Sequence, residues 1–215
     1  MLDAGIPYKK INVGYVDYAI ITHEHGDHAH IPTIKKLLAN GTDIYMTKGT
    51  RDKLKLENRH NLHTFTAGLT MPPLRIADCW FKAIPAKHDA AEPIVFQLYD
   101  DEDRLLYSTD TREPQDWSGE DNDFTKILIE TNFSEAALLE SEIDDWRKQR
   151  VFESHSSIER VEKWFKKHKF PNLKELHLIH ISKVNGFKTV NGKKENFQTV
   201  LESIKTLNGI PIYTH

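Results

Sequence analysis

The chain has 215 residues, of which 39% are hydrophobic and 28% are charged, and its formal net charge is −3. This composition is typical of one globular domain, here residues 1–215, which can bury enough apolar surface to fold without disulfides. The small negative charge excludes a general attraction to nucleic acid or to anionic membranes, so any such binding must use a local basic patch.

The compartment can also be inferred from the sequence. Cys79 is the single cysteine, which excludes an intramolecular disulfide and suits a reducing compartment. The opening MLDAGIPYKK has no apolar leader segment, and no run approaches the ~20 apolar residues of a membrane-spanning helix. We therefore expect a cytoplasmic protein that does not enter the membrane.

The first part of the chain predicts a strand, a helix and a second strand. Residues 16–21 (VDYAII) form a short apolar run with β-branched residues, as in a buried strand. Apolar residues then recur at helical spacing over residues 31–38, with Pro32 in the first turn and Asn40-Gly41 as the end. Residues 42–46 predict the next strand.

The rest of the chain predicts further strands, two of them joined as a hairpin, and two more helices. The expected strands are residues 79–84, 94–98, 104–108, 126–130, 176–181 and 210–213. The expected helices carry apolar stripes at 158, 161, 164 and 165 and at 197, 200, 201 and 204. Strands that come first in runs and later alternate with helices predict a layered α/β fold with a mixed sheet.

Groups that can bind metal follow several of these strands. His88, Asp110 and His180 each come after or at the end of an apolar run, and THEHGDHAH, residues 22–30, follows the strand at 16–21. Open α/β folds build their sites from groups that separate strands deliver to one edge of a sheet. We therefore expect these groups to form one site.

The segment THEHGDHAH is the densest group of candidate ligands. His23 and His25 are too close in sequence for the paired histidines of a helical zinc protease. They can still converge on one ion if the loop turns sharply, and Gly26 is expected to supply the permissive backbone for that turn. A catalytic zinc ion takes about three protein ligands and keeps one position for water. This loop alone offers four candidates, His23, His25, Asp27 and His28, so the sequence predicts two metals.

The spacing His23-x-His25-x-Asp27-His28 resembles the HxHxDH signature of the metallo-β-lactamase fold. The other motifs of that superfamily have counterparts in the same order: Asp3 in MLDAG, His88, Asp110 in YSTDT and His180 in LIHIS. The resemblance covers nearly the whole chain. It implies a four-layer αββα sandwich with a two-metal centre along one edge.

The resemblance also implies a ligand set. One ion would be held by His23, His25 and His88, and the other by Asp27, His28 and His180. Asp110 would bridge the two ions, and Asp3 would orient a ligand histidine. This nitrogen and oxygen set suits Zn²⁺, and Mn²⁺ accepts the same ligands.

Members of the superfamily usually have a strand pair and a Gly-Ser-rich turn before the first aspartate. The resemblance therefore implies a sandwich that lacks these usual first strands, since Asp3 is the third residue. A sheet edge left exposed in this way favours pairing with another strand, as in a homodimer.

The sequence resembles the YycJ/WalJ-like branch of nucleic-acid-processing members more than the β-lactam hydrolases. Many β-lactam hydrolases have a cysteine where this chain has Asp110. Residues 129–133 (IETNF) resemble the E-A/T-N segment of the branch, and residues 154–157 (SHSS) stand where it has a G-H-L-S-type segment. By this resemblance His155 would contact the scissile phosphate or protonate a leaving oxygen.

Basic residues gather in the last third of the chain: Arg160, Lys163, Lys166, Lys167, Lys169, Lys174, Lys183, Lys188, Lys193 and Lys194. Acidic residues gather instead at residues 100–103 and 116–123. A solvated helix face explains many such basic runs, but a local excess of positive charge is also what phosphate binding needs.

The resemblance implies a metal-dependent phosphodiester hydrolase that acts on DNA or RNA, as a 5′ exonuclease, through a hydroxide activated by two metals. Asp27 would orient this hydroxide as well as bind metal, and His180 and His155 would lie near the leaving oxygen. Two alternatives stay open. One is a thioester or lactone hydrolase of the same fold, which would not need the basic residues. The other is an inactive relative that binds metal or nucleic acid without turnover.

Overall fold

The computed structural model describes residues 1–68, 73–115, 123–190 and 192–215. The chain divides into two compact units. Unit 1 comprises Met1–Ala77, Lys82–Pro85 and Asp89–Ile94, and unit 2 comprises Asp78–Phe81, Ala86–His88 and Val95–His215. None of the helices in the described ranges has the length and apolar character needed to span a membrane.

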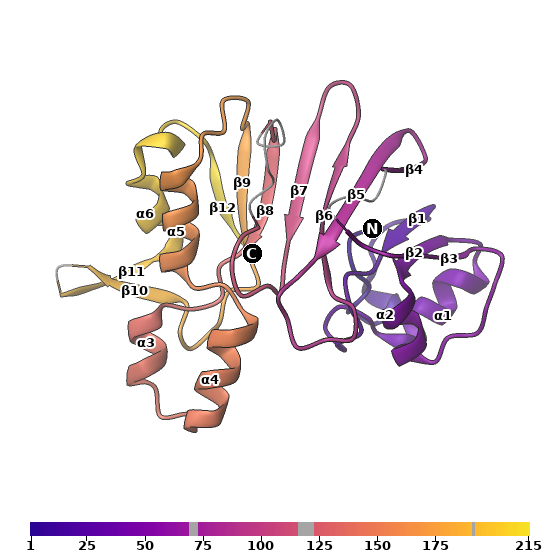
Figure 1. The fold of residues 1–215 in the computed structure, drawn as a ribbon, viewed down its shortest axis with the longest axis horizontal. Helices are drawn as coiled ribbons and strands as arrows, with labels where there is room; N and C mark the ends of the chain where they lie inside the picture. The colour runs from indigo at the N-terminus through magenta and orange to yellow at the C-terminus, as the bar shows by residue number, and fades with distance from the viewer. Residues whose placement is uncertain (69–72, 116–122, 191) are drawn as a thin grey trace. The chain divides into compact units, whose positions relative to one another are not determined.

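Unit 1 is built on a parallel three-stranded sheet in the order β1-β2-β3. Its strands are β1 (Tyr18–Ile20), β2 (Asp43–Thr47) and β3 (Leu62–Phe65). Helix α1 (Ile31–Ala39) connects β1 to β2, and α2 (Lys48–Leu54) connects β2 to β3. Figure 1 shows both helices beside this sheet. A 3-10 turn (Tyr8–Lys10) precedes the sheet, and β4 (Leu74–Ile76) follows it.

Helix α1 shows how the sequence sets this part of the fold. Pro32 lies in its first turn, where no backbone N–H is needed, and the helix ends before Gly41, whose φ is +90°. Its apolar face, Ile34 and Leu37, packs into a core that includes Ile44 of β2. The predicted helix is confirmed, and the predicted strand at 16–21 is confirmed as the shorter β1.

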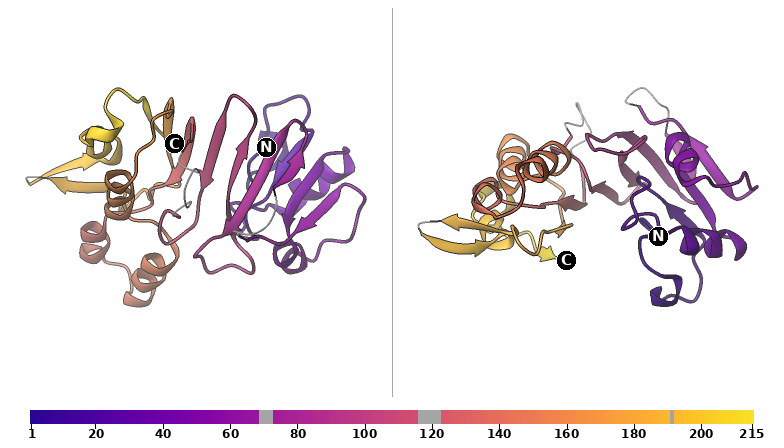
Figure 2. Two further views of the ribbon diagram at one scale, coloured as in Figure 1. Left: turned by 45° about the horizontal axis from the view of Figure 1, so that its top comes forward. Right: turned by 90° about the horizontal axis from the view of Figure 1, so that it is seen from below.

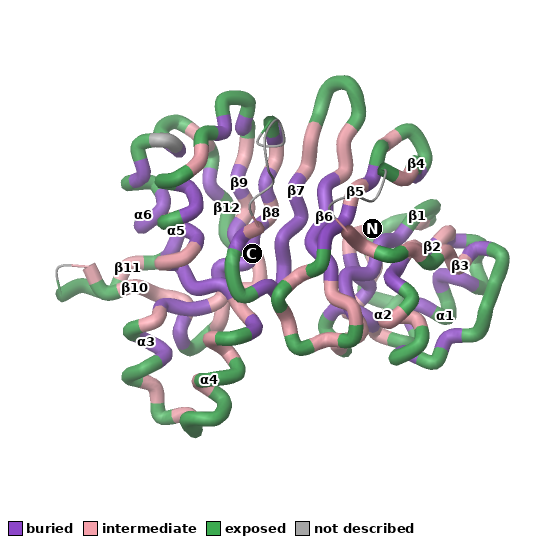
Figure 3. Tube along the Cα trace, viewed as in Figure 1, coloured by how far each residue is buried: buried purple, intermediate pink, exposed green. Residues whose placement is uncertain are grey.

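The strands of unit 2 lie in the order β12-β9-β8-β7-β6, and β5 follows β6. They are β6 (Ile94–Tyr99), β7 (Arg104–Ser108), β8 (Lys126–Glu130), β9 (Glu175–Ile179) and β12 (Ile212–Thr214). Strand β5 (Cys79–Pro85) is divided between the units, since its first residues belong to unit 2 and Lys82–Pro85 to unit 1. β6 and β7 form an antiparallel hairpin, whereas β7, β8, β9 and β12 are parallel to one another. The predicted mixed sheet is therefore confirmed, and Figure 3 shows that its central strands are mostly buried.

The parallel strands of unit 2 bring their carboxyl ends to one edge of the sheet. Ser108, the last residue of β7, pairs with Ile129, and Glu130, the last residue of β8, pairs with Ile179. The residues that follow these three strands therefore leave the sheet at the same edge.

The helices of unit 2 are α3 (Glu135–Glu140), α4 (Asp145–Ser154), α5 (Ile158–Lys167) and α6 (Phe197–Glu202), followed by a 3-10 turn (Lys205–Leu207). Ser157 caps the N-terminus of helix α5 with its hydroxyl, which accepts a hydrogen bond from the Arg160 N–H, and the helix buries the predicted apolar stripe. A hairpin of β10 (Phe187–Val190) and β11 (Lys193–Asn196) projects from the rest of unit 2 in both views of Figure 2. The acidic run at 116–123 lies outside the described residues, except for Asp123.

Candidate metal centre

The loop of unit 1 that follows β1 is held against the first residues of the chain. Asp3 N–H donates to Ile20 O at 2.9 Å, and Ala4 N–H donates to His28 O at 2.7 Å. Asp3 is 7% exposed, and its φ is +55°. Its carboxylate is thereby fixed against the loop of residues 22–30, here called the histidine loop.

Asp3 organises two histidines of this loop. Its carboxylate accepts hydrogen bonds from the Thr22 N–H at 2.7 Å, from the Thr22 hydroxyl at 2.9 Å and from Nδ1 of His28 at 2.8 Å. Because the Thr22 hydroxyl gives its proton to Asp3, it can only accept from Nδ1 of His23, 3.1 Å away. Both His23 and His28 then carry their lone pair on Nε2, as a metal ligand requires.

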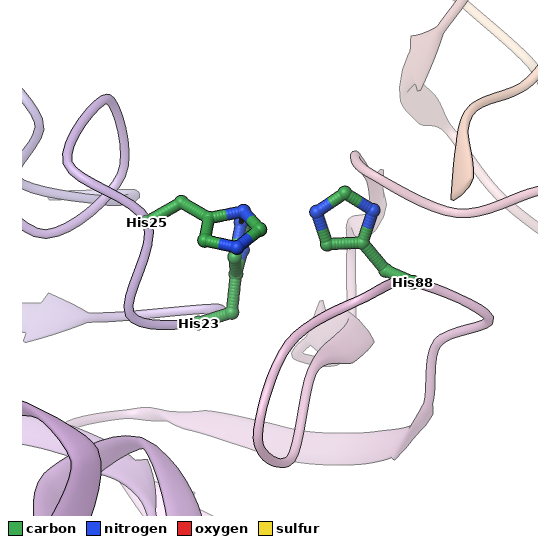
Figure 4. Close-up of side chains that lie close together, drawn as sticks. All are labelled: His23, His25 and His88. Carbon is green, nitrogen blue, oxygen red and sulfur yellow. Dashed lines mark hydrogen bonds between the residues drawn. The ribbon is translucent and has the colours of Figure 1, made fainter. Parts of the chain in front are cut away.

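His23 and His25 point their ring nitrogens at each other. Nε2 of His23 lies 3.1 Å from Nδ1 of His25, and Figure 4 shows the two rings together, with His88 drawn on the loop after β5. Two nitrogens at about 2.0–2.1 Å from one tetrahedral ion lie about 3.3 Å apart. The pair is therefore spaced like two ligands of one metal ion. Asp27, whose side chain is 65% exposed, completes this group with its Oδ2 3.7 Å from Nε2 of His28.

Gly5, rather than Gly26, is the glycine on which this loop depends. A Cβ on Gly5 would lie 1.6 Å from the carbonyl oxygen of Asp27, a distance that no packing tolerates. A Cβ on Gly26 would meet nothing within 4 Å, and Gly26 is not among the glycines with positive φ. The expectation that Gly26 supplies a special backbone conformation is therefore wrong, because the loop turns there through ordinary φ values.

A second cluster lies in unit 2, at the edge of the sheet where the carboxyl ends of β7, β8 and β9 lie, here called the strand edge. Asp110 follows β7, Glu130 ends β8 and His180 follows β9. Nδ1 of His180 lies 2.8 Å from Asp110 Oδ1 and 2.8 Å from Glu130 Oε1. Asn132 adds a hydrogen bond from its side-chain N–H to the His180 carbonyl at 2.8 Å.

Glu130 is the centre of this cluster. Its side chain is fully buried, and its Oε1 also accepts a hydrogen bond from Nδ1 of His155 at 2.7 Å. Its Oε2 accepts from the backbone N–H groups of Thr111 and Ser156, both at 3.1 Å. Four donors therefore surround one carboxylate and fix its position.

The environment of His155 has opposing effects on its pKa. Burial lowers the pKa of the imidazole, but hydrogen bonds to Asp110 and Glu130 outweigh burial and raise it to about 9.

The His155 ring lies 5.1 Å from the ring of His88, measured between centroids. His88 donates its Nδ1–H to the Ser154 carbonyl at 2.8 Å, which leaves the lone pair on Nε2.

Three of these residues have a strained backbone. Asp3, Asp110 and His180 have φ values of +55°, +42° and +55°. Side chains other than glycine rarely adopt this left-handed region, and each instance costs about 1–3 kcal/mol. Such conformations persist where the surrounding structure holds a side chain in a required direction.

The two groups of predicted residues lie in different units. His23, His25, Asp27 and His28 are together in unit 1, beside Asp3, and His88, Asp110, His155 and His180 are together in unit 2. The sequence analysis assigned no role to Glu130, although it is the last residue of a buried strand, close in position to Asp110 after β7 and His180 after β9. It also missed Thr22 and the Ser154 carbonyl, which no sequence pattern marks.

These side chains fit a divalent cation. Hydrogen bonds to oxygen acceptors fix Nδ1 of three histidines, His23, His28 and His88, so the lone pair of each ring lies on Nε2. Within unit 2, ligand atoms of Asp110, Glu130, His155 and His180 all lie within 4.8 Å of one another. Imidazole nitrogens with carboxylate oxygens are the ligands of zinc and of manganese.

Comparison with known proteins extends these observations. Residues 6–181 match the family described as "Beta-lactamase superfamily domain". The chain is 28% identical to exodeoxyribonuclease WalJ of Streptococcus pneumoniae, over 87% of this chain and 75% of WalJ.

Solved structures show the same fold. The metallo-β-lactamase fold protein YhfI from Bacillus subtilis superposes with a TM-score of 0.67 at 15% identity, over 100% of this chain and 83% of YhfI. The short form of human tRNase Z superposes with a TM-score of 0.58 at 16% identity, over 85% of this chain and 81% of that enzyme. The chain therefore belongs to the β-lactamase superfamily, as a hydrolase with the metallo-β-lactamase fold that is similar to the WalJ-like branch.

Proposed function

We propose that this chain hydrolyses phosphodiester bonds of nucleic acid, as an exonuclease acting from the 5′ end, with two divalent cations, Zn²⁺ in first place. The observation that carries the proposal is the pair of ligand clusters, each built so that hydrogen bonds fix its histidines. The similarity to WalJ, an exodeoxyribonuclease, supports the choice of substrate.

In this proposal the ligand set is the one that the resemblance to the superfamily implies. Three histidines would hold one cation: His23, His25 and His88. A carboxylate and two histidines would hold the other: Asp27, His28 and His180. Asp110, which follows β7 at the strand edge, would bridge the two cations.

Hydrolysis joins a water oxygen to phosphorus, breaks the bond from phosphorus to the leaving oxygen and gives that oxygen a proton. The two cations, when bound, would activate the water and stabilise charge on the phosphoryl oxygens. Asp27 is exposed beside His28, so its carboxylate can orient the attacking water by accepting a hydrogen bond. Asp3 and Thr22 keep the lone pairs of His28 and His23 on Nε2 throughout.

His155 would act on the scissile phosphate or on the leaving oxygen. Its Nδ1 is held by Glu130, so Nε2 is the atom left to contact the scissile phosphate or the leaving oxygen. The hydrogen bonds of Glu130 to both His155 and His180 keep the two rings in fixed orientations. Glu130 is thus a positioning residue in this proposal.

The test is degradation of 5′-phosphorylated, end-labelled DNA and RNA by zinc- or manganese-loaded protein. We expect turnover that Asp27→Ala abolishes and that Asp52→Ala, which changes an exposed aspartate of α2, leaves intact. The labelled products report the polarity and the preference for DNA or RNA. Absence of turnover by folded, metal-loaded protein, together with turnover of thioesters or lactones, would show that the substrate class is wrong.

A further inference from the structure

We infer that a basic hollow on unit 2 binds a phosphate group of the nucleic-acid strand; this inference rests on the proposed function. The hollow has a volume of about 530 Å³. The residues that line it are Lys87, Glu113, Pro114, Gln115, Arg160, Lys163, Trp164 and Lys167. Four of these side chains are cationic and one is a carboxylate, so the lining carries a net positive charge.

One face of helix α5 supplies half of the lining. Arg160, Lys163, Trp164 and Lys167 recur three or four residues apart, so they form one stripe along the helix. Trp164 is 5% exposed and forms the apolar base of this stripe, packed against Phe170. Lys163 and Lys167 are exposed, so their ammonium groups can reach a ligand in the hollow.

Arg160 provides a positive charge in a fixed position. Its Nη1 donates to the carbonyls of Arg112, Phe152 and His155, at 2.8, 2.9 and 3.0 Å. These contacts, which the two N–H donors of Nη1 share among three carbonyls, hold the guanidinium group at the wall of the hollow. A guanidinium held in place loses little freedom when it binds a phosphate.

The hollow borders the candidate metal ligands of unit 2. Lys87 directly precedes His88, and Arg160 is bonded to the carbonyl of His155. Lys87 also pairs with Glu113, and this hydrogen bond is the main cause that holds the pKa of the Glu113 carboxyl below its usual value. A strand whose phosphate occupies the hollow would therefore have a neighbouring bond close to His88 and His155.

Other basic residues of the chain pair with carboxylates that do not line the hollow. Lys166 pairs with Glu162 at 3.3 Å, Lys188 also pairs with Glu162, and Lys174 pairs with Asp103 at 2.8 Å. These pairs offset part of that charge. In the hollow, Lys87 pairs with Glu113 and Nε of Arg160 lies 3.6 Å from Oε1 of Glu135, but the lining still has four cationic side chains and one carboxylate. Lys166 is thus a matched control for Lys163, because both are exposed lysines of the same helix.

The experiment measures binding separately from turnover. Fluorescence anisotropy follows a labelled single-stranded DNA, bearing either a 5′-phosphate or a 5′-hydroxyl, in EDTA, where metal-dependent cleavage stops. Each phosphate contact to a single strand contributes roughly 0.7 to the slope of log affinity against log salt. We expect Lys163→Ala/Lys167→Ala to bind more weakly and, because both lysines serve one phosphate, to lower this slope by roughly 0.7. Lys166→Ala is expected to match the wild type.

The two DNA probes identify which phosphate is bound. A loss confined to the 5′-phosphorylated probe assigns the hollow to the terminal phosphate, and an equal loss with both probes assigns it to an internal one. Unchanged affinity and slope in the double variant, or an equal loss in Lys166→Ala, would overturn the inference.

Turnover of bis(p-nitrophenyl) phosphate, which has no strand to occupy the hollow, separates the two proposals. We expect the double variant to keep the wild-type rate on this compound while its KM for DNA rises. If the wild type cleaves neither DNA, RNA nor this compound, the proposed function fails whatever the binding result. If the wild type cleaves DNA and the double variant cleaves it with an unchanged KM, the inference about the hollow fails and the proposed function stands.

Discussion

The carboxylate of Glu130 lies 2.8 Å from Nδ1 of His180, although 50 residues separate them in the chain. Because Glu130 holds Nδ1 as the donor, it leaves Nε2 of His180 as the nitrogen for a metal. A partner of this kind raises the basicity of a ligand histidine and fixes its ring. The role of Glu130 can be tested without removing any proposed ligand.

Replacing Glu130 by glutamine is expected to weaken zinc binding by about 10- to 100-fold. The amide is neutral, and its NH₂ group would face either a histidine Nδ1–H or the N–H groups of Thr111 and Ser156. Competition with a chromophoric zinc chelator measures the affinity. The exposed Glu140→Gln is the control, and equal affinities for the two variants would refute a role for Glu130 in orienting ligands.

Replacing Asp3 by asparagine is expected to destabilise the metal-free protein by about 1–3 kcal/mol. Asp3 accepts hydrogen bonds from Thr22 and His28 in a buried position, and the asparagine NH₂ group would face one of these donors. Urea unfolding, followed by circular dichroism, measures the change. Asp101→Asn, at an exposed turn, is expected to leave the unfolding midpoint unchanged. If Asp3→Asn has the same midpoint as this control, the hydrogen bonds of Asp3 do not stabilise the protein.

Replacing Gly5 by alanine is expected to destabilise the protein by about 3 kcal/mol or more, since its Cβ would collide with the Asp27 backbone. The histidine loop must move to relieve this collision, so zinc binding should be lost as well. Gly26→Ala adds the same methyl group in open space and is expected to change stability by about 0.5 kcal/mol at most. Denaturant titration compares the stabilities of the two variants, and zinc titration compares their metal binding. If Gly26→Ala is less stable than Gly5→Ala, the prediction is wrong.

Replacing Phe165 by alanine is expected to cost about 3–5 kcal/mol of stability. This ring is fully buried on α5 and packs against Trp164 and Phe170, with centroids 5.0 and 5.4 Å away. Trp146→Ala removes an aromatic ring that is 63% exposed, and we expect a change of about 0.5 kcal/mol or less. Equal losses for the two variants in denaturant titration would show that α5 does not belong to the core.

The sequence predicted the elements that bury apolar residues in regular patterns. The strands at 94–98, 104–108 and 126–130 and the helix that begins at Ile158 were found because their side chains form the core. Helix α4 was missed because, of its residues, Ser154 alone is buried, so no apolar stripe marks it. The β10–β11 hairpin was missed for the same reason, since its residues are exposed or half-buried and many are charged.

The candidate site was predictable only in part. The histidine loop is continuous in sequence, so spacing and resemblance were enough to select His23, His25 and His28. The role of Glu130 depends on contacts with His155 and His180, which lie far from it in the chain, and no local pattern encodes those contacts. The assignment of the full ligand set, like the assignment of a single domain, stays a prediction.

The sequence distances within the two clusters also bear on how the site forms during folding. Asp3 and His28 are 25 residues apart, whereas His88 meets the Ser154 carbonyl across 66 residues. Closing the longer loop costs more chain entropy, by about 0.6 kcal/mol for each doubling of length. Contacts between distant segments also slow folding. The histidine loop should therefore become ordered early in refolding, and competence to bind metal should wait for the strand edge of unit 2.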